Sequence, residues 1–251
     1  MATTAAAHGR RRIARLARQL TAAPATASLA GKVALVTGGT GAIGSAVAAQ
    51  LAALGCRIIV VDLDETKCEA FAKTLPTRST GVAFNVADEA SVVGGVSRAL
   101  RRLREIGGAA QGVEGVDILI NIAGILSNNK LFETTAQEWA RVNSINYDGC
   151  FFLAKACMKH MQRQKWGRVV NMSSWAWKSG GLTAGTAYSS SKAAVVGLTF
   201  SLARQFAADG ITVNGVAPCY VFSRMIMEQL TQAQREELLT KIPVGKFCTP
   251  E

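Results

Sequence analysis

Short apolar runs alternate with helical stretches from Gly31 onward, and this alternation constrains the fold more than any other feature. The runs are rich in β-branched residues and nearly continuously apolar, as strands buried on both faces of a sheet are. They span residues 32–37, 57–62, 81–86, 116–121, 167–173 and 210–216. The stretches between them favour helices and span 42–54, 65–75, 89–106, 136–164 and 187–208. Repeated strand–helix–strand units predict an α/β domain with an open, doubly wound parallel sheet.

Size and composition narrow the possibilities. The 251 residues are 49% hydrophobic, enough for one large domain. No apolar run reaches the length of about 18 residues that a membrane span needs. Six Cys are spread without a Cys-x-x-Cys pair and only two His are present. This pattern favours reduced Cys that pack as small apolar residues, and no metal site is expected.

The chain has a net charge of +11, and its positive charge is most concentrated at the amino end. Residues 1–30 hold five Arg and no acidic residue, while the remainder has 23 basic and 17 acidic residues. No nucleic-acid module is recognisable, so no nucleic-acid partner is expected. An amphipathic, Arg-rich leader without acids is typical of a transit peptide to the mitochondrial matrix or another organelle. The alternative is a disordered basic tail on a cytoplasmic protein. In both cases residues 31–251 are expected to form the folded domain.

A glycine-rich turn follows the first strand and begins a helix. Ligands of such sheets bind outside the carboxyl ends of the strands, and a helix N-terminus with free N–H groups favours phosphate. The turn therefore predicts a dinucleotide site. Its expected contacts are Gly38, Thr40, Gly41, Ile43 and Gly44.

Asp62 ends the second strand, 18 residues after Gly44. A carboxylate there can accept hydrogen bonds from the adenosine ribose hydroxyls and would repel a 2′-phosphate. Positions 41 and 63 are Gly and Leu rather than Arg or Lys. Lys67, the nearest base, lies about a turn into the next helix. The sequence therefore favours NAD over NADP, with Leu63 beside the ribose.

Tyr188 and Lys192 lie one turn apart in a predicted helix that is apolar on nearly all sides. Buried Lys is rare unless it is paired or functional. This pair therefore points to chemistry when it is taken with the other motifs.

These motifs, taken in order, resemble the short-chain dehydrogenase/reductase family over residues 31–251. The chain is most similar to the 3-oxoacyl-carrier-protein reductases of fatty acid metabolism. The stretches that carry the resemblance are TGGTGAIG from Thr37, NIAG from Asn121, SINYDG around Asn146, VVNMSS ending at Ser174, YSSSK from Tyr188 and VNGVAPCYVFS around Pro218. The resemblance implies a Rossmann-type fold and an oxidoreductase that moves hydride between a nicotinamide cofactor and a carbonyl or secondary alcohol.

The resemblance also implies four catalytic residues. Tyr188 would exchange a proton with the substrate oxygen, and Ser174 would donate a hydrogen bond to that oxygen. A free Tyr has a pKa of about 10, and the Lys192 ammonium is expected to lower it. Lys192 would also hold the nicotinamide ribose, and Asn146 would hold a water that links Lys192 to solvent.

Further cofactor contacts are implied by the same motifs. They are Asn85, Val86, Asn121, Ala123, Gly124, Tyr188, Lys192, Pro218, Val221 and Ser223. The sequence departs from the family pattern at three positions. Ile122 stands where an Asn is usual, Asn85 where an Asp is often found, and Cys219 where a Gly is usual.

The substrate pocket is expected to follow the fifth and sixth strands. Its predicted residues are Ser174, Trp175, Tyr188, Phe222 and Met225, with Leu126, Trp177 and Met227 as further candidates. Core packing is the alternative for each of them. Thr231 and Gln234 form a capping box for a helix over 232–240, and two short helices in this region are expected to form a lid.

An aromatic and Met-lined cleft suits a 3-oxoacyl chain on a carrier protein or CoA. Four basic residues, Lys159, Arg163, Lys165 and Arg168, could face an acidic carrier, although Asp209 and Asp62 argue against one. A sugar or polyol substrate, a 3-hydroxyacyl-CoA and a catalytically idle NAD-binding structural subunit are the alternatives.

Assembly follows from the two long helices, 136–164 and 187–208. Their apolar residues exceed what one sheet face can cover, with Cys150, Phe151, Phe152, Met158 and Leu202 as examples. The resemblance implies a homodimer through these helices. The family's final helix and strand are missing from this sequence, so an exposed edge is expected at the sixth strand, and a tetramer is expected only for a longer chain.

Overall fold

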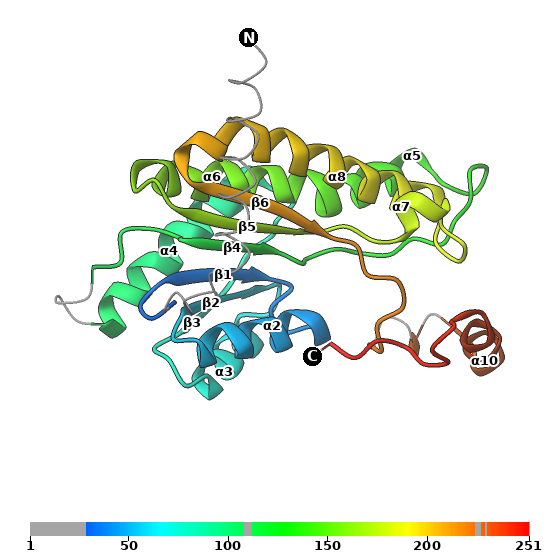
Figure 1. Ribbon diagram of the computed structural model, residues 1–251, viewed down its shortest axis with the longest axis horizontal. Coiled ribbons are helices and arrows are strands. Elements are labelled where there is room, and N and C mark those ends of the chain that lie inside the picture. Colours follow the sequence, from blue (N-terminus) through cyan, green and yellow to red (C-terminus); the bar gives the residue numbers. More distant parts are fainter. Residues whose placement is uncertain (1–28, 108–111, 224–226, 229, 251) are drawn as a thin grey trace, which may run out of the picture.

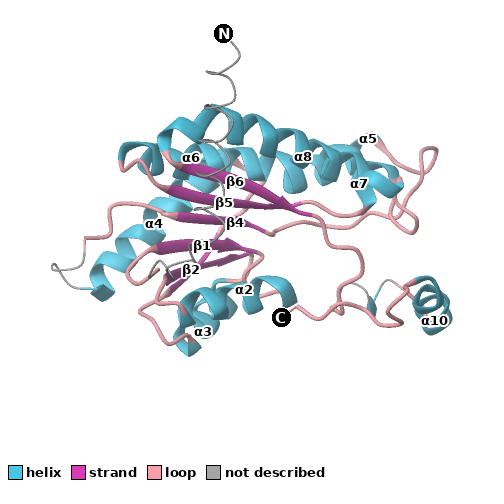
Figure 2. Ribbon diagram, in the orientation of Figure 1, coloured by secondary structure: helices cyan, strands magenta, loops and turns pink. Residues whose placement is uncertain are grey.

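The computed structural model describes residues 29–107, 112–223, 227–228 and 230–250. Its main body has three layers, with one sheet between two layers of helices (Figures 1 and 2). Residues 1–28 of the predicted leader lie outside the described residues, and Leu29 packs against the hydrophobic core. Among the described residues, no helix has the length and apolarity that crossing a membrane requires.

The sheet has six parallel strands in the order β3-β2-β1-β4-β5-β6. Their bounds are β1 Val33–Thr37, β2 Arg57–Asp62, β3 Thr80–Ala83, β4 Ile118–Asn121, β5 Gly167–Met172 and β6 Ile211–Val216. The doubly wound prediction is confirmed. The strand order reverses between β1 and β4, which is where such sheets bind ligands.

Helices cover the two faces of the sheet unequally. One face packs under α4 (Glu89–Gly107), α6 (Gly149–Arg163) and α8 (Thr186–Phe206). The other face packs under α2 (Ala42–Ala53) and α3 (Glu65–Thr74). Each interface is a cluster of buried aliphatic side chains, whose burial is the main force that holds the layers together.

The remaining elements are short. They are α5 (Ala136–Asn143), the π-helical turn η1 (Ser144–Asp148), α7 (Ala176–Ser179), the 3-10 turn η2 (Ala207–Asp209) and α10 (Gln232–Lys241). The capping box at Thr231 and Gln234 is confirmed. The α10 helix lies beyond the carboxyl ends of the strands (Figure 1). A second lid helix was expected in the same stretch, where residues 224–226 and 229 lie outside the described residues.

Two predicted elements differ from the structure. The helix expected over 136–164 is three successive pieces, because the π-helical turn shifts its hydrogen-bond pattern at 144–148. The third strand ends at Ala83, not at residue 86. The reason is that the Asn85 side chain and carbonyl accept bonds from the amides of Ala87 and Asp88, which turns the chain toward α4.

The apolar surface that α6 and α8 leave exposed is smaller than the sequence predicts. Cys150 and Met158 are buried within the chain, and Phe152 and Leu202 pack against the same core cluster. Of the five residues that were expected to remain uncovered by the sheet, only Phe151 is exposed. Phe200 on α8 is exposed too, although it was not among those residues.

Candidate active site

A cavity of about 490 Å³ lies at the carboxyl ends of the strands, along the switch point between β1 and β4. It extends from the glycine turn after β1 to the segment that follows β6. Many of the predicted site residues line it, namely Gly38, Gly41, Ile43, Asp62, Leu63, Asn85, Val86, Ala123, Gly124, Leu126, Ser174, Trp175, Tyr188, Lys192, Pro218, Val221 and Ser223.

The turn after β1 depends on its glycines. Gly38 has a φ of +62°, which favours glycine. A Cβ on Gly44 would lie 2.1 Å from the Gly38 carbonyl oxygen, so α2 can begin this close to the strand only without a side chain there. The Thr37 hydroxyl accepts hydrogen bonds from the amides of Ile122 and Ala123, at 3.0 and 3.1 Å, which joins the ends of β1 and β4. This shape suits a pyrophosphate at the start of α2.

Asp62 lies at the other end of this turn. Its Oδ2 accepts bonds from the Thr40 amide (3.2 Å) and hydroxyl (2.5 Å), and its Oδ1 accepts from the Leu63 amide (2.9 Å). A carboxylate has about four acceptor positions, so about one remains for a ribose hydroxyl. Thr40 and Gly44 shape the turn without lining the cavity.

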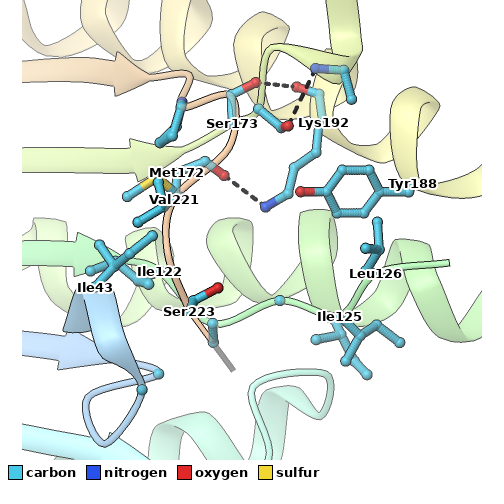
Figure 3. A pocket seen from close by; sticks show the side chains of 18 of the residues that line it. Ile43, Ile122, Ile125, Leu126, Met172, Ser173, Tyr188, Lys192, Val221 and Ser223 are labelled. Carbon is cyan, nitrogen blue, oxygen red and sulfur yellow. Dashed lines mark hydrogen bonds between the residues drawn. The ribbon is translucent and has the colours of Figure 1, made fainter. Parts of the chain in front are cut away.

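The Tyr188 and Lys192 side chains meet inside the cavity. Figure 3 shows the Tyr188 hydroxyl beside the end of the Lys192 side chain, whose ammonium is directed at the Met172 carbonyl. Lys192 is 3% exposed, and its Nζ donates to the Met172 carbonyl at the end of β5, at 2.8 Å. The Ser173 hydroxyl donates to the Lys192 backbone carbonyl at 2.8 Å, so β5 and α8 are joined twice at this point (Figure 3).

The expected lowering of the Tyr188 pKa is wrong. Burial raises the pKa of Tyr188, and the hydrogen bond with Ser174 only partly opposes that rise. Burial also lowers the pKa of Lys192, against an opposing effect of Cys150. The Lys192 ammonium bonds to the Met172 carbonyl, and it lies 5.8 Å from the centre of the Tyr188 ring. The helix spacing therefore brings the pair together without making Tyr188 a phenolate.

Asn146 lies in the π-helical turn and is fully buried. Its Oδ1 accepts from the Ile125 amide at 2.8 Å, and its Nδ2 donates to the Ile125 carbonyl and the Ser191 hydroxyl at 3.0 Å each. A Cβ on Gly124 would lie 3.0 Å from Asn146 Oδ1 and 3.3 Å from Lys192 Nζ. Asn146 thus fixes the loop after β4 beside Lys192, and its water-holding role stays a prediction.

Several predicted contacts are not part of the cavity. The Asn121 side chain is buried and donates to Asn171 at 2.8 Å. Phe222, Trp177 and Met227 do not line the cavity and are exposed. Met225 lies outside the described residues.

The basic residues expected to face a carrier flank the amino end of β5. Lys165 pairs with Asp209, and the Arg168 guanidinium stacks on Trp166. Because β5 carries Ser174 beyond its carboxyl end, these residues lie at the opposite end of the sheet from the cavity of the same chain. The basic residues therefore do not flank the entrance of the cavity.

The structure adds cavity residues that were not among the predicted site residues. Met172, Ser173, Arg141, Ser179 and Tyr220 line the cavity, as does the stretch 181–184. Met172 and Ser173 directly precede Ser174, so their place at a strand end was the available signal. The stretch 181–184 follows no periodic pattern and gave none.

The sheet, the glycine turn and the Tyr188–Lys192–Ser174 group together define a nicotinamide-dependent oxidoreductase. The chain belongs to the short chain dehydrogenase family, whose family model matches residues 32–234.

Curated relatives agree with this assignment. The chain is 35% identical to the 3-oxoacyl-[acyl-carrier-protein] reductase FabG of Haemophilus influenzae, over 86% of this chain and 85% of that protein. It is 36% identical to the FabG of Escherichia coli (86% and 84% covered) and 32% identical to that of Aquifex aeolicus (89% and 87% covered).

Proposed function

We propose that this chain reduces the keto group of a 3-oxoacyl thioester with Tyr188 as the proton donor. The observation that carries the proposal is the pairing of the half-buried Tyr188 with the buried Lys192 at the carboxyl end of β5, in one cavity with the glycine turn. The similarity to 3-oxoacyl-[acyl-carrier-protein] reductases supports the substrate class.

The cavity has the parts that a nicotinamide dinucleotide needs. The turn at Gly38 and Gly41 would hold the pyrophosphate, Asp62 the adenosine ribose, and Lys192 the second ribose. When bound, the cofactor supplies hydride to the substrate carbonyl carbon.

Tyr188 supplies the proton for the reduction. Its raised pKa keeps the hydroxyl protonated at neutral pH, which is the form that donates to a developing alkoxide. The Ser174 hydroxyl stabilises the same oxygen with a hydrogen bond. Once the proton has left, the phenolate lies beside the Lys192 ammonium, which lowers the energy of the charged form.

We propose NAD rather than NADP as the preferred cofactor. The Asp62 carboxylate lines the cavity, and a 2′-phosphate beside it would be repelled. Its neighbour Leu63 is apolar and exposed, so it offers no cation to the phosphate.

The substrate end of the cavity favours an acyl chain over a polyol. Its walls include Leu126, Trp175, Leu182 and Ala184, which offer apolar contact to a chain, beside the polar Arg141, Ser179 and Thr183. The test is oxidation of NADH and NADPH with acetoacetyl thioesters of CoA and of an acyl carrier protein, beside a panel of sugars. Turnover of the thioesters supports the proposal. Turnover of sugars alone, or of nothing despite cofactor binding, would replace it with a polyol enzyme or an idle subunit.

We also propose a homodimer through α6 and α8. The exposed Phe151 and Phe200 side chains on these helices support it, since a shared apolar face gains stability from burial. Sedimentation of the protein and of its Phe200→Glu variant tests the idea: a dimer that the variant weakens is expected. A well-folded monomer would contradict it.

A last proposal concerns the leader, residues 1–30, as an organellar transit peptide. Fusion of these residues to a fluorescent protein should direct it to mitochondria or another organelle. A diffuse cytoplasmic signal would contradict this role.

A further inference from the structure

We infer that Lys130 is a positioning residue that fixes one wall of the substrate cavity. The wall segment comprises residues 181–185, directly before α8. Four of its residues line the cavity, namely Gly181, Leu182, Thr183 and Ala184. The inference deepens the proposed function and rests on it, because this wall lies beside the position proposed for the acyl chain.

The wall segment has little structure of its own. It contains no helix or strand. The chain enters it through Gly180 and Gly181, with φ values of +73° and +75°. Such successive glycines leave the backbone free to move unless other groups hold it.

The Lys130 ammonium supplies that hold. Its Nζ donates to the Gly181 carbonyl at 3.0 Å and to the Ala184 carbonyl at 2.6 Å. Within the part of the chain that the structure describes, no other hydrogen bond holds residues 181–184. A charged donor makes each of these bonds stronger than one between neutral groups.

The carboxyl-terminal end of the wall segment, at Gly185, is fixed by backbone hydrogen bonds instead. The Gly185 amide donates to the Ser127 carbonyl at 2.6 Å, and the Thr186 amide to the Asn129 carbonyl at 3.1 Å. A Cβ on Gly185 would lie 2.3 Å from the Asn129 carbonyl oxygen, so the two loops touch through their backbones. Lys130 extends this contact between the two loops to the amino-terminal end of the wall segment, at Gly181.

The loop that carries Lys130 is itself firmly attached. Glu138 on α5 accepts bonds from the Ser127 hydroxyl and the Asn129 amide group, at 2.5 and 2.8 Å. The bond from Ser127 is the main reason that the pKa of Glu138 lies below its usual range. The Lys130 backbone amide donates to Glu133 at 3.0 Å. Lys130 therefore transmits the position of α5 to the wall segment.

The consequence concerns substrate binding more than chemistry. Tyr188 and Lys192 are held by α8 and by the Met172 carbonyl, independently of Lys130. Loss of the Lys130 ammonium should therefore loosen the acyl subsite and raise KM while kcat changes little.

The experiment compares Lys130→Met, Lys130→Arg and Lys73→Met. Met keeps the length of the side chain, and Lys73 is an exposed lysine on α3, far from the cavity, that serves as the control. The substrate is the acetoacetyl thioester of N-acetylcysteamine, which carries no charge and so does not respond to the lost charge itself.

In Lys130→Met we expect KM to rise about tenfold, from misplacement of the bound chain. We expect kcat and cofactor affinity to stay within about twofold. Lys130→Arg should recover much of the loss, and the control should not change. An unchanged KM in Lys130→Met would overturn the inference.

A second measurement does not depend on turnover. The Gly185 and Thr186 amides are hydrogen-bonded, so their hydrogen exchange in the free protein reports opening of the wall segment. Exchange at both should accelerate severalfold in Lys130→Met and not in Lys73→Met. Unchanged exchange overturns the role of Lys130. If the unaltered protein turns over no thioester, the proposed function fails instead, and the exchange result still decides the role of Lys130.

Discussion

The two halves of the sheet differ on the face that α2 and α3 cover. The strand register aligns Val36 of β1, Ile120 of β4, Val170 of β5 and Asn214 of β6 in one row. Along this row Val36 is 0% exposed and Ile120 is 6% exposed, whereas Val170 is half-buried and Asn214 is exposed. The nucleotide half, β1 to β4, is thus closed on both faces. The catalytic half, β5 and β6, is closed only under α6 and α8.

The contrast shows how the two halves of the site are stabilised. The dinucleotide turn lies on strands whose burial is complete on both faces, so apolar packing fixes its position. In the catalytic half, Ser174 follows β5, while Asn146 and Lys192 come from η1 and α8. Individual polar bonds hold this half of the site: Lys192 to Met172, Asn146 to Ile125, and Lys130 to the wall segment. Changes in the nucleotide half should therefore act on stability, and changes in the catalytic half on turnover.

The largest effect is expected from Tyr188→Phe. The variant keeps the ring and removes the proton donor, so turnover should fall by about 10²–10⁴-fold. Cofactor affinity, measured by fluorescence titration, should stay nearly unchanged because Asp62 and the glycine turn lie in the other half. Retention of more than a few per cent of turnover would mean that another group donates the proton.

The second-largest effect is expected in the free energy of unfolding, where the two halves of the sheet should differ. Val36→Ala removes a fully buried side chain and should cost about 2 kcal/mol of unfolding free energy. Val216→Ala on β6 removes a side chain that is 47% exposed and should cost less than about 0.5 kcal/mol. Urea denaturation of both variants measures the difference. Equal losses would show that something covers the bare face of β6 in solution.

The same contrast explains what the sequence could predict. The six strands and the glycine turn follow from β-branched runs and from their order, most clearly for β1, β2 and β4, which are buried on both faces. The run 210–216 predicts a nearly continuously apolar strand, whereas in β6 the exposed Thr212 and Asn214 alternate with buried residues. The exposed Lys130 gives no periodic signal, so its bonds to the wall segment could not be predicted. The spacing of Tyr188 and Lys192 predicted that they meet, but not the burial that raises the Tyr188 pKa.

A smaller effect is expected from Asp62→Ala, which tests the cofactor preference of the nucleotide half. Loss of the carboxylate removes a hydrogen bond to the ribose and the repulsion of a 2′-phosphate. The ratio of NADH to NADPH efficiency should therefore fall about tenfold, as expected for one bond to a charged group. Steady-state kinetics with both cofactors measures the ratio. An unaltered protein that prefers NADPH would contradict the assigned role of Asp62.

The smallest effect concerns Glu65, a charged link between elements of the nucleotide half. It accepts bonds from the Ala83 amide at 2.8 Å and from Arg102 at 2.6 Å, which ties α3 to β3 and α4. The Ala83 amide is the main reason that the pKa of Glu65 is lowered, with Arg102 adding to it against the effect of burial. Because the folded pKa lies below the unfolded value of about 4.3, the stabilisation is present above that pH and is lost as the pH falls through the folded pKa. The side chain is 36% exposed, and solvent screening keeps the expected loss in Glu65→Gln below about 1 kcal/mol at pH 7. Urea denaturation of both proteins between pH 7 and pH 3 should show this difference shrinking toward zero. A difference that persists unchanged at the acid end would mean that Glu65 stabilises the fold through packing and not through its charge.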